Sequence, residues 1–208
     1  MKNRRPVVYI VDDDTSVCRS LSLLLKSHGF KVETFTRAAE FLSFKHPKLP
    51  SCLILDIQMP GINGLALQKV MAERQLTIPI VFITGHGDIP MSVKSIKAGA
   101  VDFLTKPVTE KKLLNAVSLA VLKSNTQYKK QTKTSKILRL IKTLTPRELE
   151  VFRLVAKGMS NKQIAYKQGT VLQTIKLHRG RVMKKMQAKS VAELIQLALK
   201  AGIIPFKK

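Results

Sequence analysis

The stretch that decides the fold is "VVYIVDDD", residues 7–14, in which three carboxylates directly follow an apolar run. The run is about five residues long and rich in β-branched side chains, which is typical of a buried strand. Adjacent carboxylates repel one another, so their grouping needs an explanation. Three are open at this point: an acidic turn, a catalytic pair of carboxylates, or half of a cation site.

Similar apolar runs recur through the first half of the chain and alternate with segments in which apolar residues have helical spacing. The runs are "PVVYIVD", "KVETF", "SCLILD", "IPIVFIT" and "AVDFLT", and helices are expected over 15–28, 37–44, 64–74, 90–98 and 108–123. This alternation predicts an α/β fold with a doubly wound, five-stranded parallel sheet and helices on both faces. Such sheets bind ligands at the carboxyl ends of their strands.

Charge is unevenly distributed along the 208 residues, whose formal net charge is +24. Residues 1–123 hold 17 Lys and Arg against 10 Asp and Glu, whereas residues 124–208 hold 20 against 3. A part this basic predicts a polyanionic partner, above all nucleic acid.

No apolar run approaches the roughly 20 residues that cross a bilayer. The start lacks the apolar core of a signal peptide, so no membrane association and a cytoplasmic location are expected. Cys18 and Cys52 are interpreted as reduced packing residues.

Residues 124–142, "SNTQYKKQTKTSKILRLIK", hold six Lys and Arg and no acidic residue, Gly or Pro. They are interpreted as a basic linker that extends the preceding helix, or as an arm that also touches phosphate. Only helical patterns follow, and the longest covers about residues 171–187. The sequence therefore predicts an α/β domain over 1–123, the linker over 124–142 and an all-α domain over 143–208.

Several polar groups are expected at one edge of the sheet. Asp12 and Asp13 follow the first strand and Asp56 ends the third, and these strands are neighbours in the common doubly wound order. Three carboxylates so close together require a cation, and Mg²⁺ is favoured because it prefers oxygen ligands. Thr84 and Lys106 end two further strands. A hydroxyl, an ammonium and a metal ion around one carboxylate suit the binding of a phosphoryl group.

The motifs "VVYIVDDD", "LILDIQMPGINGL", "PIVFITGHGD" and "AGAVDFLTKP" resemble the receiver domain of bacterial two-component response regulators. The stretch "TGHGDIPMSVKSIKAGAVDFLTKPV" is especially similar to regulators of the FixJ type. The resemblance implies a CheY-like, flavodoxin-like strand order 2-1-3-4-5 and a phosphoacceptor at Asp56. It also implies that Asp13 and Asp56 bind Mg²⁺ directly, that Asp12 acts mainly through water, and that the backbone carbonyl of Gln58 completes the protein ligands.

The same resemblance assigns roles at the other strand ends. Thr84 would turn inward to hydrogen-bond the phosphoryl group, and Phe103 would move with it. Lys106 would pair with a phosphoryl oxygen, and its peptide bond to Pro107 would be cis.

Residues 144–198 carry their own signals. Thr145, Pro146 and Glu148 form a helix start with a capping hydroxyl and a returning carboxylate. A short helix from Ser160, the turn "QGT" and the most basic helix predict a helix-turn-helix unit, whose second helix can enter the major groove. The face expected to contact DNA consists of Gln173, Lys176, Leu177, Gly180, Arg181 and Lys184. Arg179 falls on the opposite, inner face and is expected to pair with Glu148 or Glu150.

The stretches "LTPRELEVFRLVAKGMSNKQIA", "TIKLHR" and "MKKMQAKSVAELIQLA" resemble the LuxR-type output domain, a four-helix bundle that binds DNA as a dimer. Three positions of the turn depart from that family. The chain has Gln168 in place of Leu, Thr170 in place of an apolar residue, and Val171 in place of a capping Ser. Thr170 is expected to cap the second helix one residue early.

Together these observations predict a transcription regulator, not an enzyme, that phosphorylation of Asp56 switches. The implied partners are a sensor histidine kinase, promoter DNA, a second copy of the phosphorylated chain and, as a further candidate, RNA polymerase. Two alternatives remain open. One is an aspartate-nucleophile phosphatase with Asp12 as the nucleophile, and the other is a receiver that controls an RNA- or protein-binding domain.

Overall fold

The computed structural model describes residues 5–85, 93 and 95–205. The chain forms two compact units, residues 1–129 and residues 130–208. The division falls inside the basic segment predicted as a linker. Among the described residues, no helix is both long enough and apolar enough to cross a membrane.

The first unit is built on a parallel sheet with the strand order β2-β1-β3-β4-β5, which confirms the predicted topology. The strands are β1 (Val7–Val11), β2 (Lys31–Phe35), β3 (Ser51–Asp56), β4 (Ile80–Thr84) and β5 (Asp102–Thr105). Every residue of β1, β3 and β4 is buried, as expected for strands that are covered on both faces. From β1 the chain passes to β2 on one side and then crosses to β3 on the other side of β1. The topological switch point therefore lies between β1 and β3.

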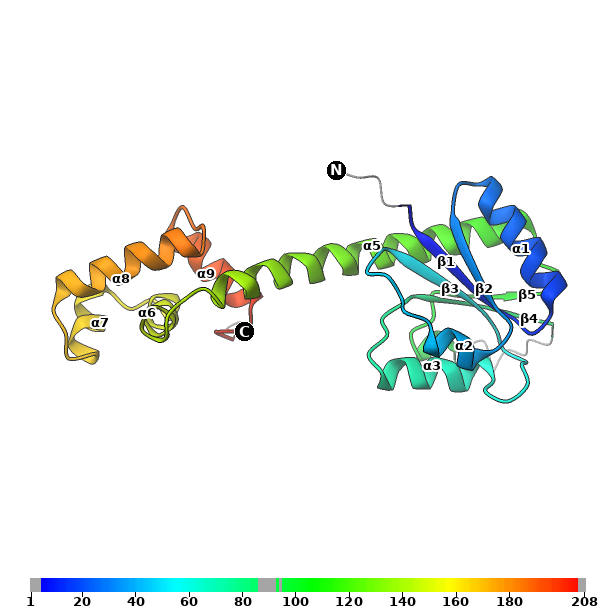
Figure 1. Cartoon of the computed structure of the whole chain (residues 1–208), viewed down its shortest axis with the longest axis horizontal. Helices are drawn as coiled ribbons and strands as arrows, with labels where there is room; N and C mark the ends of the chain where they lie inside the picture. The colour runs from blue at the N-terminus through cyan, green and yellow to red at the C-terminus, as the bar shows by residue number, and fades with distance from the viewer. Residues whose placement is uncertain (1–4, 86–92, 94, 206–208) are drawn as a thin grey trace. The chain divides into compact units, whose positions relative to one another are not determined.

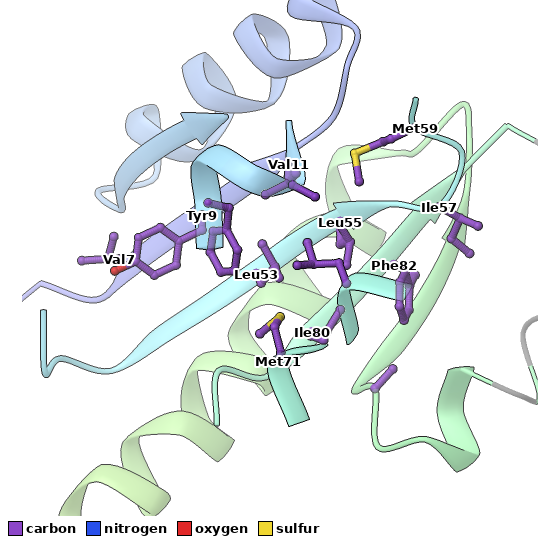
Figure 2. Packing of buried hydrophobic residues seen from close by; sticks show 14 residues of the cluster. Val7, Tyr9, Val11, Leu53, Leu55, Ile57, Met59, Met71, Ile80 and Phe82 are labelled. Carbon is purple, nitrogen blue, oxygen red and sulfur yellow. The ribbon is translucent and has the colours of Figure 1, made fainter. Parts of the chain in front are cut away.

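Side chains alternate between two apolar cores, one on each face of the sheet. Tyr9, Leu53, Leu55 and Phe82 pack in the core of one face, drawn in Figure 2. Helices α2 (Ala38–Ser43) and α3 (Gly64–Glu73) cover this face (Figure 1). The alternate residues of the same strands pack on the opposite face beneath helices α1 (Thr15–Ser27) and α5 (Glu110–Ile141). The period of two along each strand therefore fixes which helices cover which face.

The basic segment extends the preceding helix, as expected. Helix α5 continues through the basic segment as far as Ile141, with Leu113, Ala116 and Val117 in the core of the first unit. Of the helix expected over 90–98, residues 93 and 95–97 are helical, and residues 90–92 and 94 lie outside the described residues.

The second unit is all-helical in its described part. Its helices after α5 are α6 (Pro146–Ala156), α7 (Asn161–Lys167), α8 (Leu172–Lys185) and α9 (Val191–Lys200). The start of α6 has the predicted capping box: Thr145 accepts from the Glu148 amide, and the Glu148 carboxylate accepts from the Thr145 amide. Phe152, Ile175 and Leu194 pack in one core together with Ile137, which belongs to the end of α5.

Candidate functional site

The carboxylates expected at the sheet edge converge there. Val11 of β1 is paired with Leu55 of β3, so the next residues, Asp12 and Asp56, lie side by side at the carboxyl ends of these strands. Carboxylate oxygens of Asp12, Asp13 and Asp56 lie within 4.8 Å of one another. Asp12 and Asp56 are buried, whereas Asp13 is exposed to solvent. This set of hard oxygen donors is suited to a divalent cation such as Mg²⁺.

Lys106 brings a positive charge to the two buried carboxylates. Its Nζ atom lies 2.8 Å from Oδ2 of Asp12 and 3.1 Å from Oδ1 of Asp56. Its backbone N–H donates to the carbonyl of Thr84, which holds the end of β5 to the end of β4. The Lys106–Pro107 peptide bond is cis, as expected. Three carboxylates and one ammonium leave two negative charges, which a divalent cation would neutralise.

Burial and charge both act on the ionisation of this cluster. Burial raises the pKa of the Asp56 carboxyl above its ordinary value, and the Lys106 ammonium opposes the rise. For Lys106, burial alone would lower the pKa of the ammonium, but the hydrogen bonds to Asp12 and Asp56 outweigh it and raise that pKa. Asp56 and Lys106 therefore each favour the charged form of the other.

Asp14, the third acid of the opening stretch, is the N-cap of α1. Its carboxylate accepts hydrogen bonds from the amides of Ser16 and Val17, at 2.8 Å and 3.3 Å, and from the Ser16 hydroxyl. These hydrogen bonds lower the pKa of the Asp14 carboxyl. The two roles in "DDD" separate here, because Asp14 stabilises a helix start while Asp12 and Asp13 belong to the cluster.

The remaining predicted groups of the first unit lie at the same edge. Thr84 is the last residue of β4 and is fully buried. Gln58 is exposed, two residues after Asp56, and its backbone N–H helps to lower the pKa of that carboxyl. Phe103 is paired with Phe82 and partly buried against the core beneath α2 and α3.

Helices α7 and α8 form the predicted helix-turn-helix unit. All six residues of the face expected to contact DNA are exposed: Gln173, Lys176, Leu177, Gly180, Arg181 and Lys184. Ile175 and Val182 of the same helix, and Met186 at its C-cap, are buried in the core. The exposed face of α8 is therefore basic and includes one apolar residue, Leu177.

Two sequence expectations about this unit are wrong. Arg179 pairs with neither Glu148 nor Glu150, because its Nη1 donates to the Asn161 side-chain oxygen at 2.6 Å and so joins α8 to the start of α7. Thr170 does not cap α8, since the helix begins after Val171, which supplies no side-chain cap. A spacing argument alone could not select Asn161, which lies 18 residues from Arg179.

The turn between α7 and α8 has an anchor that the sequence did not reveal. Arg147 of α6 donates from Nη2 to the carbonyl of Gln168 at 3.3 Å and from Nη1 to Glu150 at 2.9 Å. Gly169 has a φ of +58°, a conformation that favours glycine. Both side-chain amide atoms of Gln168 are buried, and neither has a hydrogen-bond partner within the described residues.

Family models match both units. Residues 8–118 match the response regulator receiver domain. Residues 142–198 match the bacterial regulatory proteins of the luxR family.

Relatives with both parts align with nearly the whole chain. Nodulation protein W of Bradyrhizobium diazoefficiens is 45% identical over 96% of this chain and 88% of its own length. The transcriptional regulatory protein FixJ of Azorhizobium caulinodans is 38% identical over 95% of this chain and 94% of its own. Among solved structures, response regulator StyR has a TM-score of 0.85 at 42% identity, covering 95% of this chain and all of StyR. Full-length FixJ from B. japonicum has a TM-score of 0.54 at 37% identity, and the match covers 96% of this chain and 98% of the FixJ chain.

Proposed function

Since the chain belongs to the bacterial response regulators, in which a receiver domain is joined to a LuxR-type DNA-binding domain that regulates transcription, we propose that phosphorylation of Asp56 switches its DNA binding. The observation that carries the proposal is the buried Asp56 carboxylate, beside Asp12 and Asp13 and 3.1 Å from the Lys106 ammonium. The phosphoryl donor is a phosphohistidine of a sensor kinase.

The transfer needs a nucleophilic oxygen and positive charge around it. A carboxylate oxygen of Asp56 attacks phosphorus, the phosphorus–nitrogen bond of the phosphohistidine breaks, and the bonding pair leaves with the imidazole. Asp13 and Asp56 would hold Mg²⁺ together with the Gln58 carbonyl, and Asp12 would contribute mainly through water. When bound, the ion neutralises developing charge on the phosphoryl oxygens. Lys106 then pairs with one of those oxygens.

The phosphoryl group is read out at the ends of β4 and β5. Thr84 donates a hydrogen bond to a phosphoryl oxygen, and Phe103 moves inward with it. A shift of this kind requires a bias of a few kcal/mol, which several charge-assisted hydrogen bonds supply. The altered surface beside β5 then pairs two copies of the chain, and the dimer binds promoter DNA.

DNA binding is assigned to the exposed face of α8. Lys176, Arg181 and Lys184 contact phosphates, while Gln173 and Leu177 face base edges. The affinity is expected to fall with salt, because each neutralised phosphate releases counterions. The logarithm of the binding constant should fall against the logarithm of the salt concentration with a slope of about −0.9 per phosphate contact. The same salt series on RNA and on duplex DNA tests the alternative in which the basic domain binds RNA.

The chemical part is tested by labelling the full chain with acetyl phosphate in Mg²⁺. We expect an adduct that is labile in acid and in base, as an acyl phosphate is, on the peptide that contains Asp56. The adduct is absent in Asp56→Asn and retained in Asp12→Asn at high Mg²⁺. Loss of labelling in Asp12→Asn with retention in Asp56→Asn would instead assign the nucleophile to Asp12, as in a phosphatase.

A further inference from the structure

Lys185, in the last turn of α8, joins three segments of the second unit. Its Nζ atom donates to Oε2 of Glu148 at 2.6 Å and to the backbone carbonyl of Thr143 at 3.1 Å. The same Glu148 oxygen accepts from the Thr145 N–H at 2.8 Å. One ammonium therefore connects α8, the first turn of α6, and the short segment between α5 and α6.

The acceptor of this ammonium is a buried charge. Glu148 is 2% exposed, and its pKa is lowered first by the hydrogen bond from Lys185 and then by that from Thr145. A buried carboxylate needs both a counter-charge and hydrogen bonds, and Lys185 is the cation that pairs with Glu148 within the described residues. The partly exposed Lys185 side chain is consequently directed toward the start of α6 and is paired there.

The neighbouring residue, Lys184, provides a contrast on the same turn. It is exposed, no ion pair involves it among the described residues, and it lies on the face assigned to DNA. Consecutive residues of a helix point about 100° apart, so two adjacent lysines serve different sides of α8.

Thr143 ties this network to the end of α5. Its N–H and its hydroxyl both donate to the carbonyl of Leu140, at 3.0 Å and 2.6 Å. Leu140 packs against the core of the second unit, and Ile137, one turn earlier, is buried in it. The carbonyl that accepts from Lys185 is therefore fixed to the last turn of α5.

We propose that Lys185 is a positioning residue, which sets the placement of the DNA-reading helix relative to the end of α5 through Glu148 and Thr143. This inference rests on the proposed function of α8 in DNA binding. Because its ammonium is already paired with Glu148 and the Thr143 carbonyl, Lys185 is not expected to neutralise a phosphate.

Base readout and phosphate binding respond differently to a misplaced helix. Base contacts require the helix at a defined depth and angle in the groove, whereas nonspecific binding depends on the number of phosphates neutralised. Lys185→Met should therefore lower the affinity for a specific duplex by about 10- to 100-fold. It should leave nonspecific affinity and the salt slope nearly unchanged. Lys184→Met should lower both affinities and reduce the salt slope by about 1.

The experiment uses the full chain and a duplex that the wild type selects from a randomised pool, with a scrambled duplex as the nonspecific probe. Affinities are measured over a salt series for wild type, Lys185→Met, Lys184→Met, Lys185→Arg and Glu148→Gln. We expect Lys185→Arg to restore specificity and Glu148→Gln to lose it. The double variant, Lys185→Met with Glu148→Gln, should lose no more than either single variant. A salt slope in Lys185→Met that falls as in Lys184→Met would overturn the proposal.

A second measurement needs no DNA and separates this inference from the proposed function. Hydrogen exchange in the free chain should quicken in α8 and in residues 143–148 of Lys185→Met, and should be unchanged there in Lys184→Met. Equal exchange in the two variants overturns the positioning role, whatever the chain binds. Failure of the wild type to enrich any duplex, together with the expected exchange, would contradict the DNA-binding function and leave the positioning contact standing.

Discussion

The Nζ atom of Lys106 lies 3.1 Å from Oδ1 of Asp56, and the same ammonium lies 2.8 Å from Oδ2 of Asp12. One lysine thus balances two buried carboxylates at the switch point of the sheet. Replacing it by Met leaves those carboxylates facing each other, so we expect the receiver unit of Lys106→Met to be less stable in chelator. Bound Mg²⁺ then replaces the lost positive charge and stabilises the variant more than the wild type.

Thermal unfolding of both proteins in chelator and in saturating MgCl₂ measures this difference. A ligand present at 100 times its dissociation constant stabilises the native state by about 2.7 kcal/mol, and tighter binding gives a larger gain at the same concentration. We expect the gain of Lys106→Met to exceed that of the wild type by about 1 kcal/mol or more. Lys112→Met, an exposed substitution on α5, serves as the control. An equal gain in all three proteins would mean that Mg²⁺ does not bind beside Lys106.

Gly64 closely approaches the backbone of Asp56, the proposed phosphoacceptor. A Cβ atom added at this first residue of α3 would be 2.3 Å from the backbone oxygen of Asp56. Since that neighbour is backbone, Gly64→Ala must displace either α3 or the end of β3, and we expect a loss of roughly 1–3 kcal/mol in the free energy of unfolding. Phosphorylation by acetyl phosphate should also slow. Gly85→Ala, with open space at the added Cβ, should keep its stability within about 0.5 kcal/mol, and equal stability of both variants would contradict the close approach.

Gln168 occupies a position that would suit an apolar side chain. Its buried amide has no partner among the described residues, so replacement by Leu removes a desolvation cost without removing a hydrogen bond. We predict that Gln168→Leu stabilises the second unit by about 1–3 kcal/mol, measured by calorimetry. The exposed Gln173→Leu should change it by less than about 0.5 kcal/mol. Destabilisation by Gln168→Leu would show that the amide has a structural role in the turn.

Glu148 gives the second unit a predicted dependence on pH. Because its pKa in the folded chain is lowered from 4.5, the unfolded chain takes up the proton first as pH falls. The contribution of Glu148 to stability is therefore complete above 4.5 and is lost as pH falls through the lowered folded value. The stability difference between wild type and Glu148→Gln should be largest near neutral pH and shrink in acid. Glu150→Gln, at an exposed site, should show little difference at any pH, and a Glu148→Gln difference that is constant with pH would contradict the account.

Much of the first unit could be predicted because its determinants are local. Apolar runs such as Val7–Val11 and Ser51–Asp56 define the central strands, and parallel pairing brings the residues at their carboxyl ends together. The convergence of Asp12 and Asp56 follows from that register. The chemical roles of these residues, and the limits assigned to the two domains and the linker, stay predictions.

The contacts of the second unit were harder to predict from the sequence, because they join side chains that are far apart along the chain. Helical periodicity correctly separated the exposed Lys184 from the buried Val182. It could not choose among acceptors, so the pairs Arg179–Asn161 and Lys185–Glu148 emerged from the structure alone. The position of a cap likewise depends on where the backbone turns into the helix. The N-cap of α8 is Val171, one residue after the expected Thr170.

The most direct test of the switch combines sizing and DNA binding of the full chain with and without beryllofluoride and Mg²⁺, for wild type and Asp56→Asn. We predict that the mimic converts the wild type to a dimer and tightens binding to its selected duplex, while Asp56→Asn responds to neither. Unchanged size and unchanged affinity of the wild type, with the mimic bound, would contradict the claim that a phosphoryl group on Asp56 controls DNA binding.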